Sequence, residues 1–204
     1  MSKIIHVIAV AFERNEELKV FVQSWLNQTA ENWLLTVIHD GPSKEFEKIM
    51  RNFQREKEKK IRYICTDKRH NDYGHTLRNI GLGICQGEYV LLSNADNYFI
   101  PKAIEYLNIA IEHGNGEPDV VMYNMIHSHN RPGGRPLPPY SYFEVEYKRG
   151  SIDVSAAIVK SNIAKNVGFN DKSHDGDATY FEEIERSVNK LIVYKLPNVL
   201  FVHN

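Results

Sequence analysis

Strand-like and helix-like patterns alternate regularly through the first 123 residues. Apolar, β-rich runs occupy residues 4–11, 34–38, 61–65, 88–92 and 119–123. Amphipathic helical patterns occupy residues 16–26, 43–60, 75–86 and 101–113. This alternation predicts an α/β fold, with a mostly parallel central sheet and helices on both faces.

The pattern changes after residue 123. A segment rich in Pro, Gly, Tyr and His covers residues 127–150, and a loop of that length inside a compact domain is usually functional or disordered. A strand is expected at 152–159, a helix at 177–189, and one or two closing strands at 191–202. No repeat or linker divides the 204 residues, so we expect one domain over 1–204, with parts 1–123 and 124–204.

Composition excludes several classes of protein. Hydrophobic residues make up 42% and charged residues 25%, which are ordinary values for a soluble globular protein. The formal net charge of -1 argues against nucleic-acid binding. Cys65 and Cys85 fit no zinc or redox motif and indicate a reducing cytoplasm. We expect a cytoplasmic protein with no transmembrane segment, since no apolar run could cross a bilayer. Peripheral contact with the inner face of the membrane stays open.

Polar residues follow three of the expected strands, in loops 12–15, 40–43 and 94–98. The carboxyl ends of parallel strands are where open α/β sheets hold ligands. Asn94 and Asp96 offer oxygen ligands, which suit Mg²⁺ or Mn²⁺ carrying a diphosphate. The same residues also suit a polar turn before a helix that begins at Pro101. This segment alone fits both interpretations.

Six segments occur in an order that resembles family 2 glycosyltransferases of the GT-A fold, of the small bacterial polysaccharide type. They are Ser24-Trp25-Leu26-Asn27-Gln28-Thr29, Trp33 through Ser43, Arg78-Asn79-Ile80-Gly81, Gly87-Glu88-Tyr89-Val90, Asn94-Ala95-Asp96-Asn97 and Val167-Gly168-Phe169-Asn170. The resemblance covers most of the chain, although residues 127–150 have no counterpart. It implies a GT-A domain that binds a nucleotide-diphosphate sugar donor in 1–123 and an acceptor in 124–204.

The resemblance also implies roles for single residues in donor binding. The implied nucleotide-sugar contacts are Ala11, Phe12 and Glu13 at the base, Asp40 at the base or ribose, Arg78 at the diphosphate, and Asn94 and Ala95. The implied ligands of a divalent cofactor, Mn²⁺ or Mg²⁺, are Asp96 and His203. His39 and Asn94 stand where the family usually has acids. Structural alternatives are a turn at Asp40-Gly41-Pro42 and a surface arginine at position 78.

An acidic run that opens the last helix resembles the position of the family's general base. Asp177 is the first choice and Asp175 the second, because a carboxylate can accept the proton of an acceptor hydroxyl. Either residue could instead cap the helix. Aromatic residues of 127–150 could cover an acceptor sugar or simply pack the loop. His127 and His129 could project on one side of a strand, but a metal site there would need a third ligand.

The expected activity is metal-assisted transfer of a sugar to a saccharide or other hydroxyl acceptor, with inversion at the anomeric carbon. Two alternatives remain. A nucleotidyltransferase is disfavoured because no Gly-rich phosphate loop follows the first strand. A non-catalytic nucleotide-sugar-binding module is kept open by the replacement of expected acids at His39 and Asn94.

Overall fold

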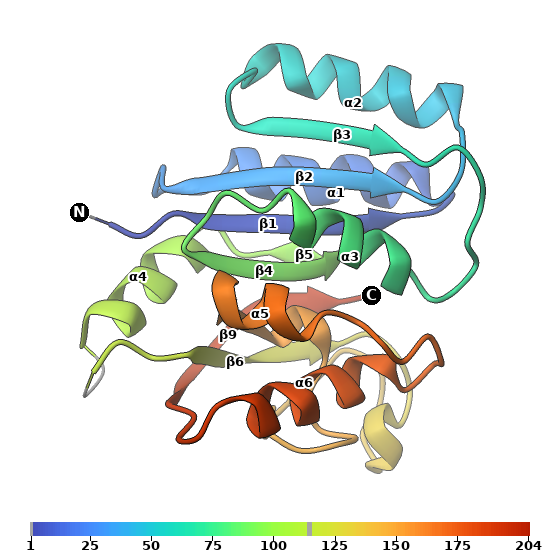
Figure 1. Ribbon diagram of the computed structural model, residues 1–204. Helices are drawn as coiled ribbons and strands as arrows, with labels where there is room; N and C mark the ends of the chain where they lie inside the picture. The colour runs from blue at the N-terminus through green and yellow to red at the C-terminus, as the bar shows by residue number, and fades with distance from the viewer. Residues whose placement is uncertain (1, 114–115) are drawn as a thin grey trace.

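The computed structural model describes residues 2–113 and 116–204 (Figure 1). The first half of the chain follows the expected alternation closely. Its elements are β1 (Ile5–Ala11), α1 (Asn15–Leu26), β2 (Trp33–His39), α2 (Lys44–Glu56), β3 (Ile61–Cys65), α3 (His75–Gly83) and β4 (Tyr89–Asn94). Ser43 caps α2 as its sequence position suggested, since its hydroxyl accepts from the Phe46 N–H at 3.2 Å.

The second half adds three helices, three short strands and the two longest strands, β6 and β9. They are β5 (Tyr98–Phe99), α4 (Ala103–His113), β6 (Val120–His127), β7 (Ser141–Phe143), β8 (Ala157–Lys160), α5 (Ser161–Val167), α6 (Gly176–Ser187) and β9 (Val193–His203). Short 3₁₀ turns lie at Pro132–Gly134 and Val154–Ala156. None of the helices described is long and apolar enough to cross a membrane.

All nine strands described belong to one sheet, in the order β3-β2-β1-β4-β8-β6-β9-β5, with β7 paired to β6. Strands β3, β2, β1 and β4 are parallel to one another, as are β6 and β9. Strands β8, β5 and β7 pair antiparallel with their neighbours. Helices cover both faces, with α3, α5 and α6 in front of the sheet in Figure 1 and α1 behind it. The predicted α/β fold is confirmed.

Several elements differ from the sequence expectation. The strands among them depend on hydrogen-bonded pairing with distant strands, which the local sequence pattern does not show. Strand β6 runs on to His127, where it pairs with β9 and β7. The run expected as a strand at 152–159 divides into a 3₁₀ turn and β8. Strand β7 and helix α5 were not expected. The segment 127–150 is therefore partly built into the sheet through Ser141–Phe143.

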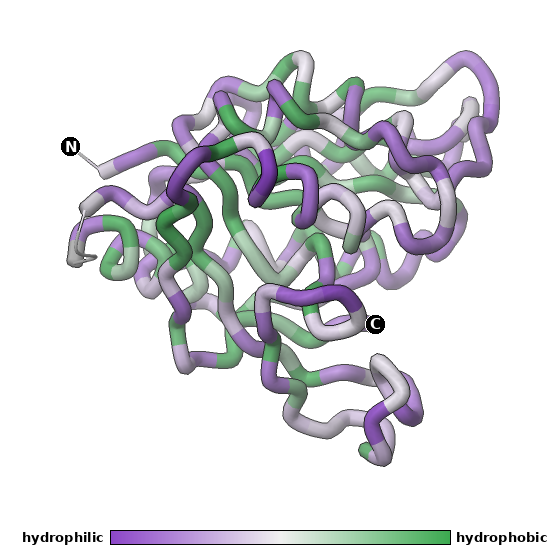
Figure 2. The backbone as a smooth tube through the Cα atoms, turned by 60° about the horizontal axis from the view of Figure 1, so that its bottom comes forward, coloured by the Kyte–Doolittle hydropathy of each residue, from purple (hydrophilic) through white to green (hydrophobic). Residues whose placement is uncertain are grey.

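Helix α3 lies unusually close to β1 because Gly81 has no side chain. A Cβ atom placed on Gly81 would lie 2.2 Å from Cγ2 of Ile8 in β1. A Cβ atom placed on Gly83 would have no neighbouring atom within 4 Å. Gly81 therefore allows the helix to pack on the sheet, and Gly83 does not take part in that packing. Figure 2 shows the apolar segments along the interior strands and the hydrophilic ones along the outer turns.

Candidate functional site

Two cavities lie side by side at the carboxyl ends of the parallel strands. The smaller, of about 330 Å³, is lined by Val10, Ala11, Phe12, Arg14, Asp40, Arg69, Asn71, Tyr73, Gly74, Leu77, Asn94 and Asp96. The larger, of about 670 Å³, contains residues from both halves of the chain. Tyr73 and Asn94 line both cavities, so the two cavities adjoin at these residues.

The loop after β1 forms one wall of the smaller cavity in a strained backbone conformation. Glu13 and Arg14 are both left-handed, with φ angles of 54° and 47°. Non-glycine residues rarely adopt this region, and such strain gathers at ligand sites. Ala11 and Phe12 line the cavity as expected, and the Arg69 guanidinium lies 3.6 Å from the centre of the Phe12 ring. Glu13 is exposed and is not among the lining residues.

Asp40 shapes the opposite wall. Its two carboxylate oxygens accept hydrogen bonds from the N–H groups of His70 and Asn71, at 2.7 and 3.0 Å. These bonds hold the loop that carries Arg69 and Tyr73 against the strand ends. His39 is buried, with Nδ1 2.7 Å from the Gly41 carbonyl and its ring on Phe46. His39 therefore contributes to the packing of β2 against α2.

Asp96 lies at the floor of the smaller cavity. Its Oδ2 accepts from Nη1 of Arg14 at 2.5 Å, and its Oδ1 is buried with no hydrogen-bond partner among the described residues. Burial raises the pKa of the Asp96 carboxyl, and the Arg14 guanidinium opposes that rise. Ala95 is buried beside it. The free oxygen gives Asp96 the capacity to bind a cation.

The carboxyl end of β9 is fixed beside this loop by Asn97. Its Oδ1 accepts from the Asn204 N–H at 3.1 Å, and its Nδ2 donates to Ser155 at 3.0 Å. His203 consequently lies close to Asp96, and each affects the pKa of the other. The His203 ring offers a buried Nδ1 that has no partner in the described part of the chain. An unpaired carboxylate oxygen and an unpaired imidazole nitrogen fit a divalent metal ion.

Asp153 supports His203 from behind. Its Oδ2 lies 3.4 Å from Nε2 of His203, and its Oδ1 accepts from the Ser155 N–H at 2.7 Å. Burial alone would raise the pKa of Asp153, but His203 and the Ser155 N–H hold it well below its usual range. Burial alone would lower the pKa of His203, and the Asp153 carboxylate raises it instead.

Arg78 is buried between the two cavities, with only 1% of its surface exposed. Its Nη2 donates to Oδ1 of Asn94 at 2.8 Å and its Nη1 to the Tyr73 carbonyl at 2.7 Å. The guanidinium thus fixes two residues that line both cavities. Its Nε has no hydrogen-bond partner among the described residues, and Arg78 lines the larger cavity.

Asp177 and Asp175 both line the larger cavity but differ in environment. The Asp177 side chain is 25% exposed, and its Oδ1 lies 3.9 Å from Nη1 of Arg78 and 3.8 Å from Nδ1 of His75. Burial raises the pKa of Asp177, and Arg78 opposes the rise. Asp175 is 67% exposed at the rim, where it faces Arg149 at 3.6 Å. Neither carboxylate caps α6 through a side-chain hydrogen bond.

Sequence reasoning missed several cavity residues, namely Arg14, Arg69, Tyr73, His75 and Asp153. Arg14 directly follows the three predicted site residues Ala11, Phe12 and Glu13, so its position was a usable signal. Asp153 reaches His203 only through the pairing of distant strands, and nothing in its local sequence marks it. His203 joins His127 and His129 in the fold, so a third imidazole lies beside the two that the sequence placed together.

The chain belongs to glycosyl transferase family 2, whose model matches residues 6–175. The match includes the loops after β1, β2 and β4 and ends at Asp175, so Asp177 lies just beyond it. An uncharacterized glycosyltransferase of Methanocaldococcus jannaschii is 31% identical over 101 residues, which are 48% of this chain and 33% of that protein. One from Rickettsia bellii is 27% identical over 101 residues, 50% of this chain and 14% of that protein.

Solved structures share the fold. Residues 1–349 of Staphylococcus aureus TarS superimpose with a TM-score of 0.78 and 15% identity, over 98% of this chain and 60% of that one. The mannosyltransferase PcManGT of Pyrobaculum calidifontis, in complex with GDP-Man and Mn²⁺, superimposes with a TM-score of 0.75 and 13% identity. That match covers 100% of this chain and 57% of the other. These likenesses confirm the GT-A-like fold. The chain spans about three fifths of these structures and a third or less of its curated relatives.

Proposed function

We propose that this chain transfers a sugar from a nucleotide-diphosphate sugar to the hydroxyl group of an acceptor, with inversion at the anomeric carbon. The observation that carries the proposal is the pair of adjoining cavities joined at Tyr73 and Asn94. The smaller cavity is lined entirely by residues of 1–123 and suits the nucleotide. The other adds residues of 124–204 and suits the transferred sugar and an acceptor such as a saccharide.

In the smaller cavity, Phe12 and Arg69 offer flat surfaces for a base, and Asp40 holds the loop that encloses it. Asn94, fixed by Arg78, faces the sugar-phosphate region. Asp96 and His203 would hold the divalent ion, Mn²⁺ or Mg²⁺, with their unpaired Oδ1 and Nδ1. When bound, such an ion stabilises the negative charge that develops on a departing diphosphate. TarS has been solved with UDP-GlcNAc and PcManGT with GDP-Man and Mn²⁺, which supports a donor of this class.

Asp177 is the proposed general base. Its buried Oδ1 accepts no hydrogen bond from the described residues, since His75 and Arg78 lie at ion-pair distances of 3.8 and 3.9 Å, which leaves the carboxylate the capacity to accept a proton. As the acceptor oxygen bonds to the anomeric carbon, its proton passes to Asp177 and the bond from that carbon to the diphosphate breaks. Arg78 and His75 hold the carboxylate in place. A raised pKa strengthens Asp177 as a base, and the exposed Asp175 is the alternative.

A thermal-shift panel tests donor binding first. Nucleoside diphosphates and nucleotide sugars are added with Mn²⁺ or with a chelator, because a ligand that binds only the folded state raises the Tm. Release of nucleoside diphosphate from the selected sugar nucleotide is then measured with candidate acceptors. Binding followed by turnover supports the transferase. Binding without turnover on any acceptor would favour the non-catalytic module, and no binding at all would overturn the proposal.

A further inference from the structure

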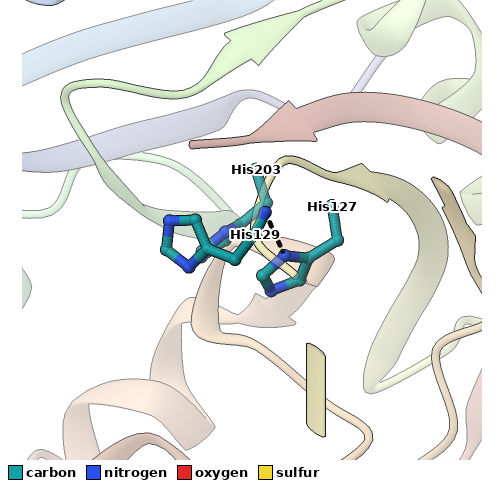
Figure 3. Close-up of side chains that lie close together, drawn as sticks. All are labelled: His127, His129 and His203. Carbon is teal, nitrogen blue, oxygen red and sulfur yellow. Dashed lines mark hydrogen bonds between the residues drawn. The ribbon is translucent and has the colours of Figure 1, made fainter. Parts of the chain in front are cut away.

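Three histidines gather where β6 and β9 end, inside the larger cavity. His127 closes β6, His203 pairs with it in register from β9, and His129 follows in the turn after β6 (Figure 3). The His127 and His203 rings stack with centroids 4.5 Å apart, and the His129 ring lies 5.1 Å from His127 and 5.6 Å from His203. One nitrogen from each ring lies within 4.8 Å of the other two.

We propose that His127, His129 and His203 form a binding site for a borderline transition-metal ion such as Zn²⁺, Co²⁺ or Ni²⁺. Imidazole nitrogens suit these ions, whereas carboxylate and amide oxygens suit Mg²⁺ and Mn²⁺. Three histidines with one open position form a known kind of zinc site. The site requires neither a nucleotide nor Asp96, and it shares only His203 with the proposed donor-linked metal.

Hydrogen bonds define which nitrogens are available. The Asp153 carboxylate faces Nε2 of His203, which leaves the buried Nδ1 unpaired among the described residues. A carboxylate behind a ligating histidine orients the ring and raises its basicity. Nδ1 of His127 accepts from the His129 N–H at 3.1 Å, the dashed line in Figure 3. In the neutral ring this nitrogen carries the lone pair, so a metal ion would take the place of that N–H.

The spacing requires a modest contraction. With metal–nitrogen bonds of about 2.0–2.1 Å, ligand nitrogens around a tetrahedral ion lie about 3.3 Å apart. In this structure the ligand nitrogens lie up to 4.8 Å apart, so the longest nitrogen–nitrogen distance has to shorten by roughly 1.5 Å. His129 is exposed and sits in a turn, so its ring can move toward the other two. Phe143, packed near His127, provides an apolar wall.

Co²⁺ absorption spectroscopy on tag-free protein tests the site directly, because bound Co²⁺ absorbs visible light according to its ligands. We expect wild-type protein to bind one equivalent of Co²⁺ without nucleotide and to release it to Zn²⁺. His129→Ala should weaken Co²⁺ binding at least tenfold, and its exposed position keeps the fold intact. His174→Ala removes an exposed histidine of the same cavity and should leave binding unchanged. Asp96→Ala should also retain Co²⁺ binding, because Asp96 is not one of the three proposed ligands.

Three results would overturn the proposal. They are no saturable Co²⁺ binding by the wild type, unchanged binding by a folded His129→Ala, or loss in Asp96→Ala as complete as in His129→Ala. A second readout uses the shared ligand: Zn²⁺ should inhibit Mn²⁺-dependent donor binding in the wild type and less so in His129→Ala. If no donor binds, the proposed function fails while the Co²⁺ result still decides this site.

Discussion

Arg14 and Asp96 form a salt bridge across the smaller cavity, with Nη1 of the arginine 2.5 Å from Oδ2 of the aspartate. The Arg14 side chain is 56% exposed and that of Asp96 is 15% exposed. The guanidinium thus neutralises the one carboxylate of the Asn94-Ala95-Asp96 loop. If Asp96 holds the proposed divalent ion, that ion has to compete with Arg14 for the carboxylate.

Replacing Arg14 should therefore increase the affinity for Mn²⁺ in the absence of nucleotide. A partly exposed ion pair is worth at most about 1 kcal/mol, so we expect roughly a fivefold gain for Arg14→Ala. Calorimetry with Mn²⁺ alone measures it. Arg69→Ala is the matched control, since this arginine lines the same cavity but stacks on Phe12. An affinity that is unchanged or weaker in Arg14→Ala would show that the salt bridge does not compete with the metal.

Two glycines of α3 should respond in opposite directions to the same substitution. Gly81→Ala places a methyl group 2.2 Å from Cγ2 of Ile8 and should lower the free energy of unfolding by about 1–3 kcal/mol. Gly83→Ala meets open space and should raise it by up to about 1 kcal/mol, because alanine favours helix. Urea unfolding of both variants measures the difference. Equal effects would mean that α3 does not pack on β1 as described.

Acid should destabilise the protein through His6. This ring is buried in β1, where Nδ1 accepts from the Gln86 N–H at 3.0 Å and Nε2 lies 2.9 Å from the Thr36 hydroxyl. Burial, with the charges of Arg62 and Lys165, lowers the pKa of His6 from 6.5 to about 4. Between pH 6.5 and 4 the unfolded state binds a proton that the folded state does not, so stability falls over that window and levels off below it.

The loss should reach at most about 3 kcal/mol, since one pKa unit corresponds to 1.36 kcal/mol. Urea unfolding at several pH values should show this decline in the wild type. His6→Gln retains polar atoms but cannot titrate, so its stability should fall less steeply from pH 6.5 to 4. Identical slopes in both proteins would remove His6 as the cause.

Most of the first half of the fold could be predicted because β1, β2 and β4 are buried on both faces, so hydropathy alone marks them. The edge strand β3 is only partly buried, and its β-rich apolar run marks it instead. Strand β7 could not be predicted, since Ser141–Phe143 is a strand only through its partner β6. The site likewise has residues that the local sequence marks and residues that only the fold brings together. Asp40 directly follows β2, Asn94 ends β4 and Asp96 lies two residues beyond it, so their places could be predicted. The contact between Asp153 and His203 depends on long-range topology.

Asp177 should be required for transfer but not for donor binding. Asp177→Asn preserves size and removes proton acceptance, which should slow transfer roughly a hundredfold or more while donor affinity changes little. Asp175→Asn is the matched control at the rim of the same cavity. Transfer rates and calorimetric donor affinities of both variants are compared. If Asp175→Asn alone abolishes transfer, the base is Asp175, and if neither does, the inverting mechanism is wrong.

The central claim is that Asp96 makes donor binding depend on a metal. Its test is calorimetric titration of the nucleoside diphosphate selected in the thermal-shift panel, into wild type and Asp96→Ala, each with Mn²⁺ and with a chelator. Circular dichroism confirms that the variant is folded. We predict that Mn²⁺ strengthens binding at least tenfold in the wild type and has no effect in Asp96→Ala. The same Mn²⁺-dependent gain in both proteins would contradict the proposed site.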